Sequence, residues 1–337
     1  MRKRILYLDV TRIMACFMIL AIHAPIPNTG LGSYVLSTDS FLMAPGLDMF
    51  VMVSGALLLP VKESYYVFLQ KRIVKIACPT FFWTLFYMVV TLFEDGVNDS
   101  NLLKSILSVP LTNQFNSTFW YMYMLAGLYF LAPILSAWLK QVTQQEIRFY
   151  LCLWGVTLCY PILRGFVGVN ESNTGILYYF SGYVGYFLLG YYLHNYVERL
   201  TEWKCLLLIL FPISIAISIK VLNFPIVFYD VFWLLSLFVA MMALAWFMFI
   251  KGVVKPYNNA SRIHHYIVLL SNCCFGIYLV HIFIMRSVIW KLTWLHDLGI
   301  MQILLVTLMT FIGSLFVTWL ISFLPWAEYI IGFRQKR

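Results

Sequence analysis

The sequence predicts an all-α fold, a polytopic integral membrane bundle of about ten transmembrane helices with both termini in the cytoplasm. Apolar residues make up 62% of the chain and charged residues 11%, whereas a soluble domain has roughly 45–50% and about 25%. The mean hydropathy is +0.84. The apolar residues also gather in runs of about 20, the length that a spanning helix needs. These observations exclude a water-soluble protein.

Ten segments have the length and apolarity of a spanning helix. Backbone amides in hydrocarbon must be satisfied within their own segment, so each segment is expected to be helical. The roughly ten-residue alternating runs of a β-barrel do not occur in the sequence. The predicted spans lie at about 10–28, 41–60, 77–93, 119–139, 149–167, 177–194, 205–221, 228–250, 266–288 and 300–324.

Basic residues predict the orientation of the bundle. Most of the 23 lysine and arginine residues lie near the two termini and in the loops around 62–75, 140–148, 199–204 and 251–262. Positively charged loops stay in the cytoplasm, which places both termini there. Because the net charge of +9 is spread over several loops, we expect no nucleic-acid partner. Segment 62–76 mixes charge and aromatic residues at helical spacing, which predicts a helix at the inner interface.

The N-terminal segment resembles a secretory signal, with MRKR followed by an apolar run. Asp9, Arg12 and His23 interrupt that run, so we predict an uncleaved first span. None of the seven cysteines forms a C-x-x-C pair. The sequence therefore predicts neither a disulfide framework nor a metal site.

Ionisable residues inside the predicted spans are candidate functional groups, since each costs about 2.5–3.5 kcal/mol to insert. Arg12 and His23 are eleven residues apart, which separates them by about 16 Å along the first span but only about 20° around it. Asp9 precedes Arg12 by three residues and can pair with it. Asp48 and His281 are predicted at the same outer depth as His23, which suggests one site.

Structural roles compete with these functional ones. A lone intramembrane histidine such as His281 can be a hydrogen-bonding strut between helices. Asp9 can simply neutralise Arg12, and Arg286 is close enough to the outer end of its span to snorkel. For Arg12 and His23 the functional interpretation is favoured, because placing both on one helix face doubles the insertion cost.

At these residues the chain resembles the acyltransferase-3 family of bacterial membrane acyltransferases. RILYLDVTRIMACFMILAIHA is similar to the family's opening span, in which Arg or Lys, ten residues and His correspond to Arg12 and His23. Four further segments follow in the family's order, and the resemblance covers about 5–325. They are GLDMFVMVSGALLL, FLQKRIVKIACPTFFW, STFWYMYMLAGLYFLAPIL and SNCCFGIYLVH. One departure is visible: the inner-loop pair is Arg72 and Lys75 rather than two arginines.

The resemblance implies a single membrane acyltransferase domain over 1–337, in the stand-alone form without a fused esterase domain. It implies transfer of an acyl group, usually acetyl from acetyl-CoA, to a hydroxyl of a cell-surface polysaccharide or its lipid-linked precursor. The protein would be a multi-pass protein of the bacterial cytoplasmic membrane. The acyl-CoA would be a donor substrate, and no bound cofactor is expected. Arg72 and Lys75 would bind the CoA phosphates, while Ser54 and Trp120 would contact substrate or support the site.

Acyl transfer to a hydroxyl needs a general base and stabilisation of the developing oxyanion. His23 is the candidate base, oriented by Asp48 or another carboxylate, and His281 would orient the acceptor or support His23. Arg12 would hold the pantetheine or pyrophosphate end of the donor, or hold the bundle together through Asp9. Direct transfer and a covalent acyl-histidine intermediate both remain open.

Two other classes of protein remain as alternatives. A transporter or flippase of glycan precursors would line a polar cavity from several helices and would act without CoA. A non-catalytic membrane sensor or scaffold would tolerate substitution of His23.

Overall fold

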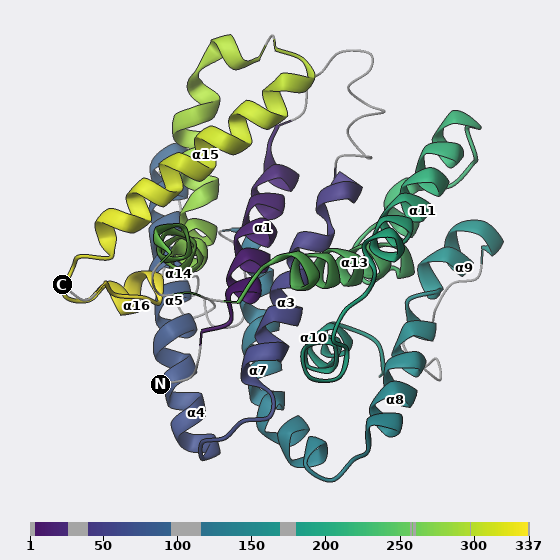
Figure 1. Cartoon of the computed structure of the whole chain (residues 1–337). Coiled ribbons are helices and arrows are strands. Elements are labelled where there is room, and N and C mark those ends of the chain that lie inside the picture. Colours follow the sequence, from purple (N-terminus) through teal and green to yellow (C-terminus); the bar gives the residue numbers. More distant parts are fainter. Residues whose placement is uncertain are drawn as a thin grey trace.

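The computed structural model describes residues 4–25, 40–95, 116–168, 180–256, 258, 261–296 and 298–335. Every regular element within them is a helix, which confirms the predicted all-α fold (Figure 1). The α-helices are α1 Leu6–His23, α3 Pro45–Leu58, α4 Tyr65–Arg72, α5 Cys78–Asp95, α7 Trp120–Leu139, α8 Gln144–Thr157, α9 Tyr160–Val167, α10 Val184–Tyr196, α11 Glu202–Val221, α12 Phe228–Val231, α13 Leu237–Val253, α14 Arg262–Phe283, α15 Ile300–Ile321 and α16 Ala327–Ile331. Short 3₁₀ and π-helical turns connect or extend several of them; they are η1 Ile73–Ala77, η2 Ser117–Phe119, η4 Ile284–Val288, η5 Ile289–Lys291 and η6 Thr293–Leu295.

Eight helical stretches of the described residues are long and apolar enough to cross a membrane, so the polytopic fold is confirmed. They are Leu6–His23, Ser40–Leu58, Tyr65–Phe93, Ser117–Leu139, Gln144–Val167, Glu202–Val221, Arg262–Lys291 and Met301–Ile321. Two predicted spans correspond to shorter helices. The described part of 177–194 overlaps the 13-residue α10, which ends at Tyr196, and 228–250 overlaps α12 and the 17-residue α13. The total of ten spans and the location of the termini stay predictions.

Helices α1, α3 and α10 form the centre of the molecule, with α3 between the other two (Figure 1). Two glycines allow α3 and α10 to touch through their backbones. A Cβ added to Gly55 would lie 1.8 Å from the Phe187 carbonyl oxygen, and one added to Gly190 would lie 1.9 Å from that of Met52. Small residues permit such close packing of membrane helices. This contact explains why the short α10 is buried from Gly185 to Leu193.

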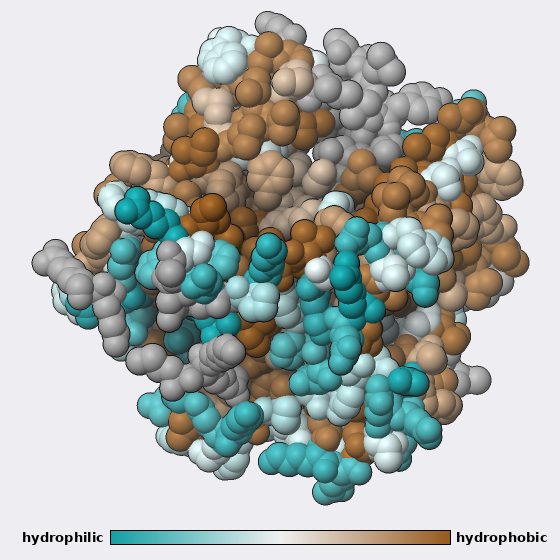
Figure 2. Space-filling view, viewed as in Figure 1, coloured by the Kyte–Doolittle hydropathy of each residue, from teal (hydrophilic) through white to brown (hydrophobic). Residues whose placement is uncertain are grey.

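Side-chain polarity divides the molecular surface into two regions. Figure 2 shows apolar side chains over the parts where α15 and α11 lie in Figure 1, and hydrophilic ones gathered towards α4 and the N-terminus. Large apolar side chains of α11 and α15, such as Leu207 and Ile312, are exposed by more than half. Exposed apolar helix faces of this size are those that a bilayer covers.

Two π-helical turns interrupt the α-helices beside the candidate site. The turn η1 (Ile73–Ala77) joins α4 to α5, and η4 (Ile284–Val288) extends α14. The predicted interfacial helix at 62–76 therefore exists as α4 but continues through η1 into one stretch, Tyr65–Phe93, rather than standing apart. Such π-turns frequently occur at functional sites.

Candidate active site

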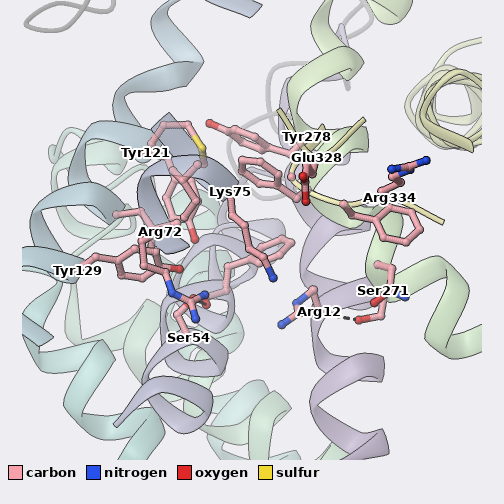
Figure 3. Close-up of a pocket in the computed structure, with 18 of the residues that line it drawn as sticks. Arg12, Ser54, Arg72, Lys75, Tyr121, Tyr129, Ser271, Tyr278, Glu328 and Arg334 are labelled. Atoms are coloured by element: carbon pink, nitrogen blue, oxygen red, sulfur yellow. Dashed lines mark hydrogen bonds between the residues drawn. The ribbon is translucent and has the colours of Figure 1, made fainter. Parts of the chain in front are cut away.

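A cavity of about 1090 Å³ lies among α1, α3, α4, α7 and α14 and the segment that follows α15 (Figure 3). It contains four residues that the sequence singled out, Arg12, Ser54, Arg72 and Lys75. The other polar side chains that line it are Tyr121, Tyr129, Ser271, Asn272, Tyr278, Glu328, Arg334 and Gln335. Four of the lining side chains are cationic and one is a carboxylate, so the cavity favours an anionic ligand.

Arg72 is held by aromatic rings on one wall of the cavity. Its guanidinium carbon lies 5.3 Å from the centre of the Phe68 ring and 5.8 Å from that of Tyr129. Its Nε is buried and makes no hydrogen bond to the described residues. A guanidinium stacked in this way keeps donors available for a phosphate or carboxylate. Lys75 lies in the π-turn η1 and is exposed at the same cavity.

Arg12 belongs to a polar network that the sequence predicted only in part. Asp9 and Arg12 are 4.0 Å apart, as the i,i+3 spacing predicts, but the closer partner of Asp9 is Arg4. Arg4 donates to both carboxylate oxygens at 2.8 and 2.9 Å. Ser271 donates to Asp9 at 2.6 Å and accepts from Arg12 at 3.1 Å (Figure 3). Asp9 is therefore neutralised mainly by Arg4, and Arg12 remains directed at the cavity.

Neither Arg4 nor Ser271 was predicted from the sequence to belong to the site. Arg4 lies before the first predicted span, where it reads as an orientation signal. Ser271 is the first residue of the SNCCFGIYLVH motif, in which a serine alone does not indicate a site. Arg4 is only five residues from Asp9 but precedes α1, so helical spacing does not describe that contact. The Ser271 contact cannot be found from spacing within one helix, because 259 residues separate Ser271 from Arg12.

His23 and His281 meet at the other end of the same helix pair. Their ring centres are 5.4 Å apart. Arg12, which is eleven residues before His23 on α1, contacts Ser271, which is ten residues before His281 on α14. Helices α1 and α14 therefore run in parallel, as the orientation of the first and ninth predicted spans requires. Eleven residues of α1 rise about 16 Å, so the two contacts lie about that far apart along the helix pair.

The His281 ring has a defined hydrogen-bonding arrangement. It is fully buried, and its Nδ1 faces the carbonyl oxygen of Tyr278 in the preceding turn. Because a carbonyl can only accept, Nδ1 carries the hydrogen and Nε2 keeps its lone pair. This Nε2 is buried and has no hydrogen-bond partner among the described residues. A basic nitrogen is thus free beside His23.

Tyr278 connects the cavity with the histidine pair. It lines the cavity, its ring centre lies 5.5 Å from that of His281, and its hydroxyl donates to the Thr118 carbonyl. On α14, Ser271, Phe275 and Tyr278 face the cavity at intervals of three or four residues, and His281 follows at the same interval. The histidine pair therefore lies one helical turn beyond the end of the cavity.

Asp48 and Trp120 lie outside this arrangement. Asp48 is fully buried and adjoins the Tyr186 hydroxyl of α10. Neither of its carboxylate oxygens hydrogen-bonds to His23 within the described structure; His281 is the residue that contacts the His23 ring. Trp120 packs on Tyr183, with ring centres 5.6 Å apart, and does not line the cavity.

Arg286 is exposed in the π-turn η4, as the predicted snorkelling requires. It is also close enough to both imidazoles to act on them electrostatically. The sequence pattern alone did not indicate that Arg286 lies beside the histidines. Within the described residues, no cluster of three or more His, Cys, Asp or Glu side chains is placed to hold a metal ion.

Fold and site together define a class of protein, a multi-pass membrane protein with a cationic cavity that leads to a pair of histidines, of which His281 is fully buried and His23 partly exposed. The acyltransferase domain of the acyltransferase-3 family matches residues 5–322. The chain therefore belongs to that family, which confirms the resemblance and makes it a membrane acyltransferase. Comparisons with curated proteins and with solved structures gave no match.

Proposed function

We propose that the protein is a membrane-bound O-acyltransferase. It takes an acyl group, most simply acetyl, from acyl-CoA and transfers it to a hydroxyl of a cell-surface polysaccharide or its lipid-linked precursor, in the bacterial cytoplasmic membrane. The observation that carries this proposal is the continuity of the site, in which a cavity lined by Arg12, Arg72 and Lys75 ends at Tyr278, one turn from His281 and His23.

The cavity suits a long anionic donor. Its volume of about 1090 Å³ is slightly above the usual range for small-molecule sites, roughly 300–1,000 Å³. Arg72 and Lys75 supply charge for phosphates at one wall. Arg12 stands further in, on the helix that also carries His23, so it holds the pyrophosphate or pantetheine part while the thioester extends towards the histidines.

His23 acts as the general base. The acceptor hydroxyl gives its proton to the His23 imidazole as its oxygen attacks the thioester carbonyl. A C–O bond forms, the C–S bond breaks, and the CoA thiolate leaves and takes up the proton from the imidazolium. His281, whose Nε2 is free, supports His23 by accepting a hydrogen bond from its ring. Asp48 stays a candidate for orienting this site through the neighbouring α10.

The test measures acylated glycan in membranes that contain the wild-type chain or one variant. We expect His23→Ala to lower acylation about 10²–10⁴-fold, the usual contribution of a general base. His265→Ala is the matched control, because His265 is exposed near the start of the same α14 and does not line the cavity. Acylation by His23→Ala at the wild-type rate would refute the catalytic assignment.

The same membranes distinguish an enzyme from a flippase. An acyltransferase releases one CoA thiol for each ester formed, and the thiol can be measured with a chromogenic reagent. A flippase would move the glycan precursor without consuming acyl-CoA. Acceptor-dependent thiol release supports the proposed enzyme, and glycan translocation without thiol release contradicts it.

A further inference from the structure

We propose that residues 323–335, here called the C-terminal segment, complete the donor site, and that Arg334 binds a phosphate of the acyl-CoA at the rim of the cavity. This inference rests on the proposed function. The family match ends at residue 322, so the C-terminal segment lies beyond the part of the chain that the family model matches. We infer that it adds donor recognition to the shared chemistry.

The C-terminal segment is firmly attached to the helices around the cavity. After α15, the chain turns back and forms α16, whose Ala327 and Ile331 are fully buried. Trp83 of α5 donates from Nε1 to the Ile330 carbonyl at 2.9 Å. Further along, the backbone N–H of Gln335 donates to the carbonyl oxygen of Ser322 at 3.1 Å, which closes the segment into a loop.

Gly332 fixes the segment against the π-turn that carries Lys75. Its φ is +69°, a conformation that favours glycine. A Cβ at this position would lie 2.6 Å from the Lys75 carbonyl oxygen and 2.8 Å from the Phe275 ring. The backbone of the C-terminal segment can therefore reach the cavity wall only because residue 332 has no side chain.

The C-terminal segment supplies one side of the cavity and two of its charges. Its residues Phe323, Pro325, Glu328, Gly332, Phe333, Arg334 and Gln335 all line the cavity. Figure 3 shows Arg334 and Glu328 on the side opposite Arg72, with Lys75 between them. Arg334 stands at the rim and has no ion pair among the described residues.

Glu328 is expected to affect CoA binding in the opposite direction to Arg334. A carboxylate beside a bound phosphate repels it, whereas a guanidinium attracts it. Removing the Glu328 charge should therefore tighten binding of CoA, and removing the Arg334 charge should weaken it. Both side chains are exposed, so the changes should be moderate because solvent screens them.

The experiment measures binding of CoA, and of pantetheine as a phosphate-free probe, to the purified full-length protein. Arg334→Ala should weaken CoA binding about three- to tenfold and leave pantetheine binding unchanged, while Glu328→Gln should tighten CoA binding severalfold. Arg199→Ala is the matched control, because Arg199 is an exposed arginine paired with Glu202 and does not line the cavity.

A backbone variant tests the attachment independently. Gly332→Ala should weaken CoA binding by displacing the segment, whereas Gly168→Ala should not. Gly168 has a similar φ of +73°, but a Cβ there meets no described atom within 4 Å. If Arg334→Ala binds CoA as the wild type does, the inference is wrong and the proposed function is unaffected. If the wild type itself binds no CoA, the proposed function fails as well.

Discussion

Individual side chains at this site are oriented by neighbouring polar groups, some of which lie far away in the sequence. Ser271 of α14 holds both Asp9 and Arg12 of α1, and the Tyr278 carbonyl sets which nitrogen of His281 carries the hydrogen. In a low-dielectric interior, such hydrogen bonds determine where a charge points and which atom is basic. The site therefore depends on residues that do no chemistry themselves.

Ser271 tests this dependence for Arg12. Ser271→Ala removes the hydroxyl that Arg12 contacts at 3.1 Å, and a hydrogen bond to a charged group contributes about 1.5–3 kcal/mol. We expect the KM for acyl-CoA to rise about tenfold or more with kcat nearly unchanged. Steady-state kinetics with Ser214→Ala as the control, an exposed serine of α11, will check this. A fall in kcat alone would contradict the role in donor binding.

Arg72 tests whether charge alone is sufficient at the cavity wall. Arg72→Lys keeps the charge but loses the planar group that stacks near Phe68 and Tyr129 and bonds phosphate in bidentate fashion. We expect CoA affinity to fall about tenfold. Lys71→Arg is the comparison, because Lys71 is the exposed neighbour, pairs with Glu63 and does not line the cavity. Equal affinities in Arg72→Lys and wild type would show that Arg72 acts only as a point charge.

At the scale of elements, the helices that carry the site are positioned by close backbone packing and by π-turns. Helix α10 is only 13 residues long and is nonetheless buried over most of its length, because Gly55 and Gly190 let it touch α3. The turn η1 places Lys75 at the cavity, and η4 places Arg286 near the histidines. Neither the glycine contacts nor the π-turns can be recognised from the pattern of apolar residues in the sequence.

Gly190→Ala should prevent correct folding, since its Cβ would overlap the Met52 carbonyl of α3 at 1.9 Å and backbone atoms cannot rotate away. We expect little monodisperse protein after extraction in mild detergent. Gly127→Ala in α7 is the control, because a Cβ there meets nothing within 4 Å. Wild-type yield and melting temperature for Gly190→Ala would show that the α3–α10 contact is looser than described.

At the scale of the whole molecule, the parallel helices α1 and α14 connect a cationic cavity at one depth with a histidine pair at another. If the basic loops lie in the cytoplasm, the cavity opens where acyl-CoA is made and the histidines lie in the outer half of the membrane. On the proposed function, the site from donor to base would then span about 16 Å of the roughly 30 Å hydrocarbon core.

Topology is directly testable with single cysteines in intact cells. Lys71→Cys should resist a membrane-impermeant thiol reagent until the cells are opened, whereas His296→Cys should react at once. Both positions are exposed, and the native cysteines except Cys152 are at least partly buried, so a Cys152→Ser background suits the assay. Labelling of both or of neither position in intact cells would overturn the predicted orientation.

Much of this protein follows from its sequence alone. The apolar runs required a membrane helix bundle, because hydrocarbon admits few other structures. Helical spacing placed Arg12 and His23 on one face of α1, and ordered motifs gave the family. The free-energy cost of inserting a charge into a membrane and the spacing of residues around a helix are properties of one segment. Both can therefore be read from a single sequence.

Contacts between segments were decided only by the tertiary structure. It placed the His23 ring against His281 rather than Asp48, and it brought Ser271 of α14 to Arg12 of α1. It also placed the C-terminal segment at the cavity. These contacts depend on the rotation and crossing of packed helices, which side-chain volumes and glycine contacts set across the whole bundle. Periodicity along one helix carries no information about them.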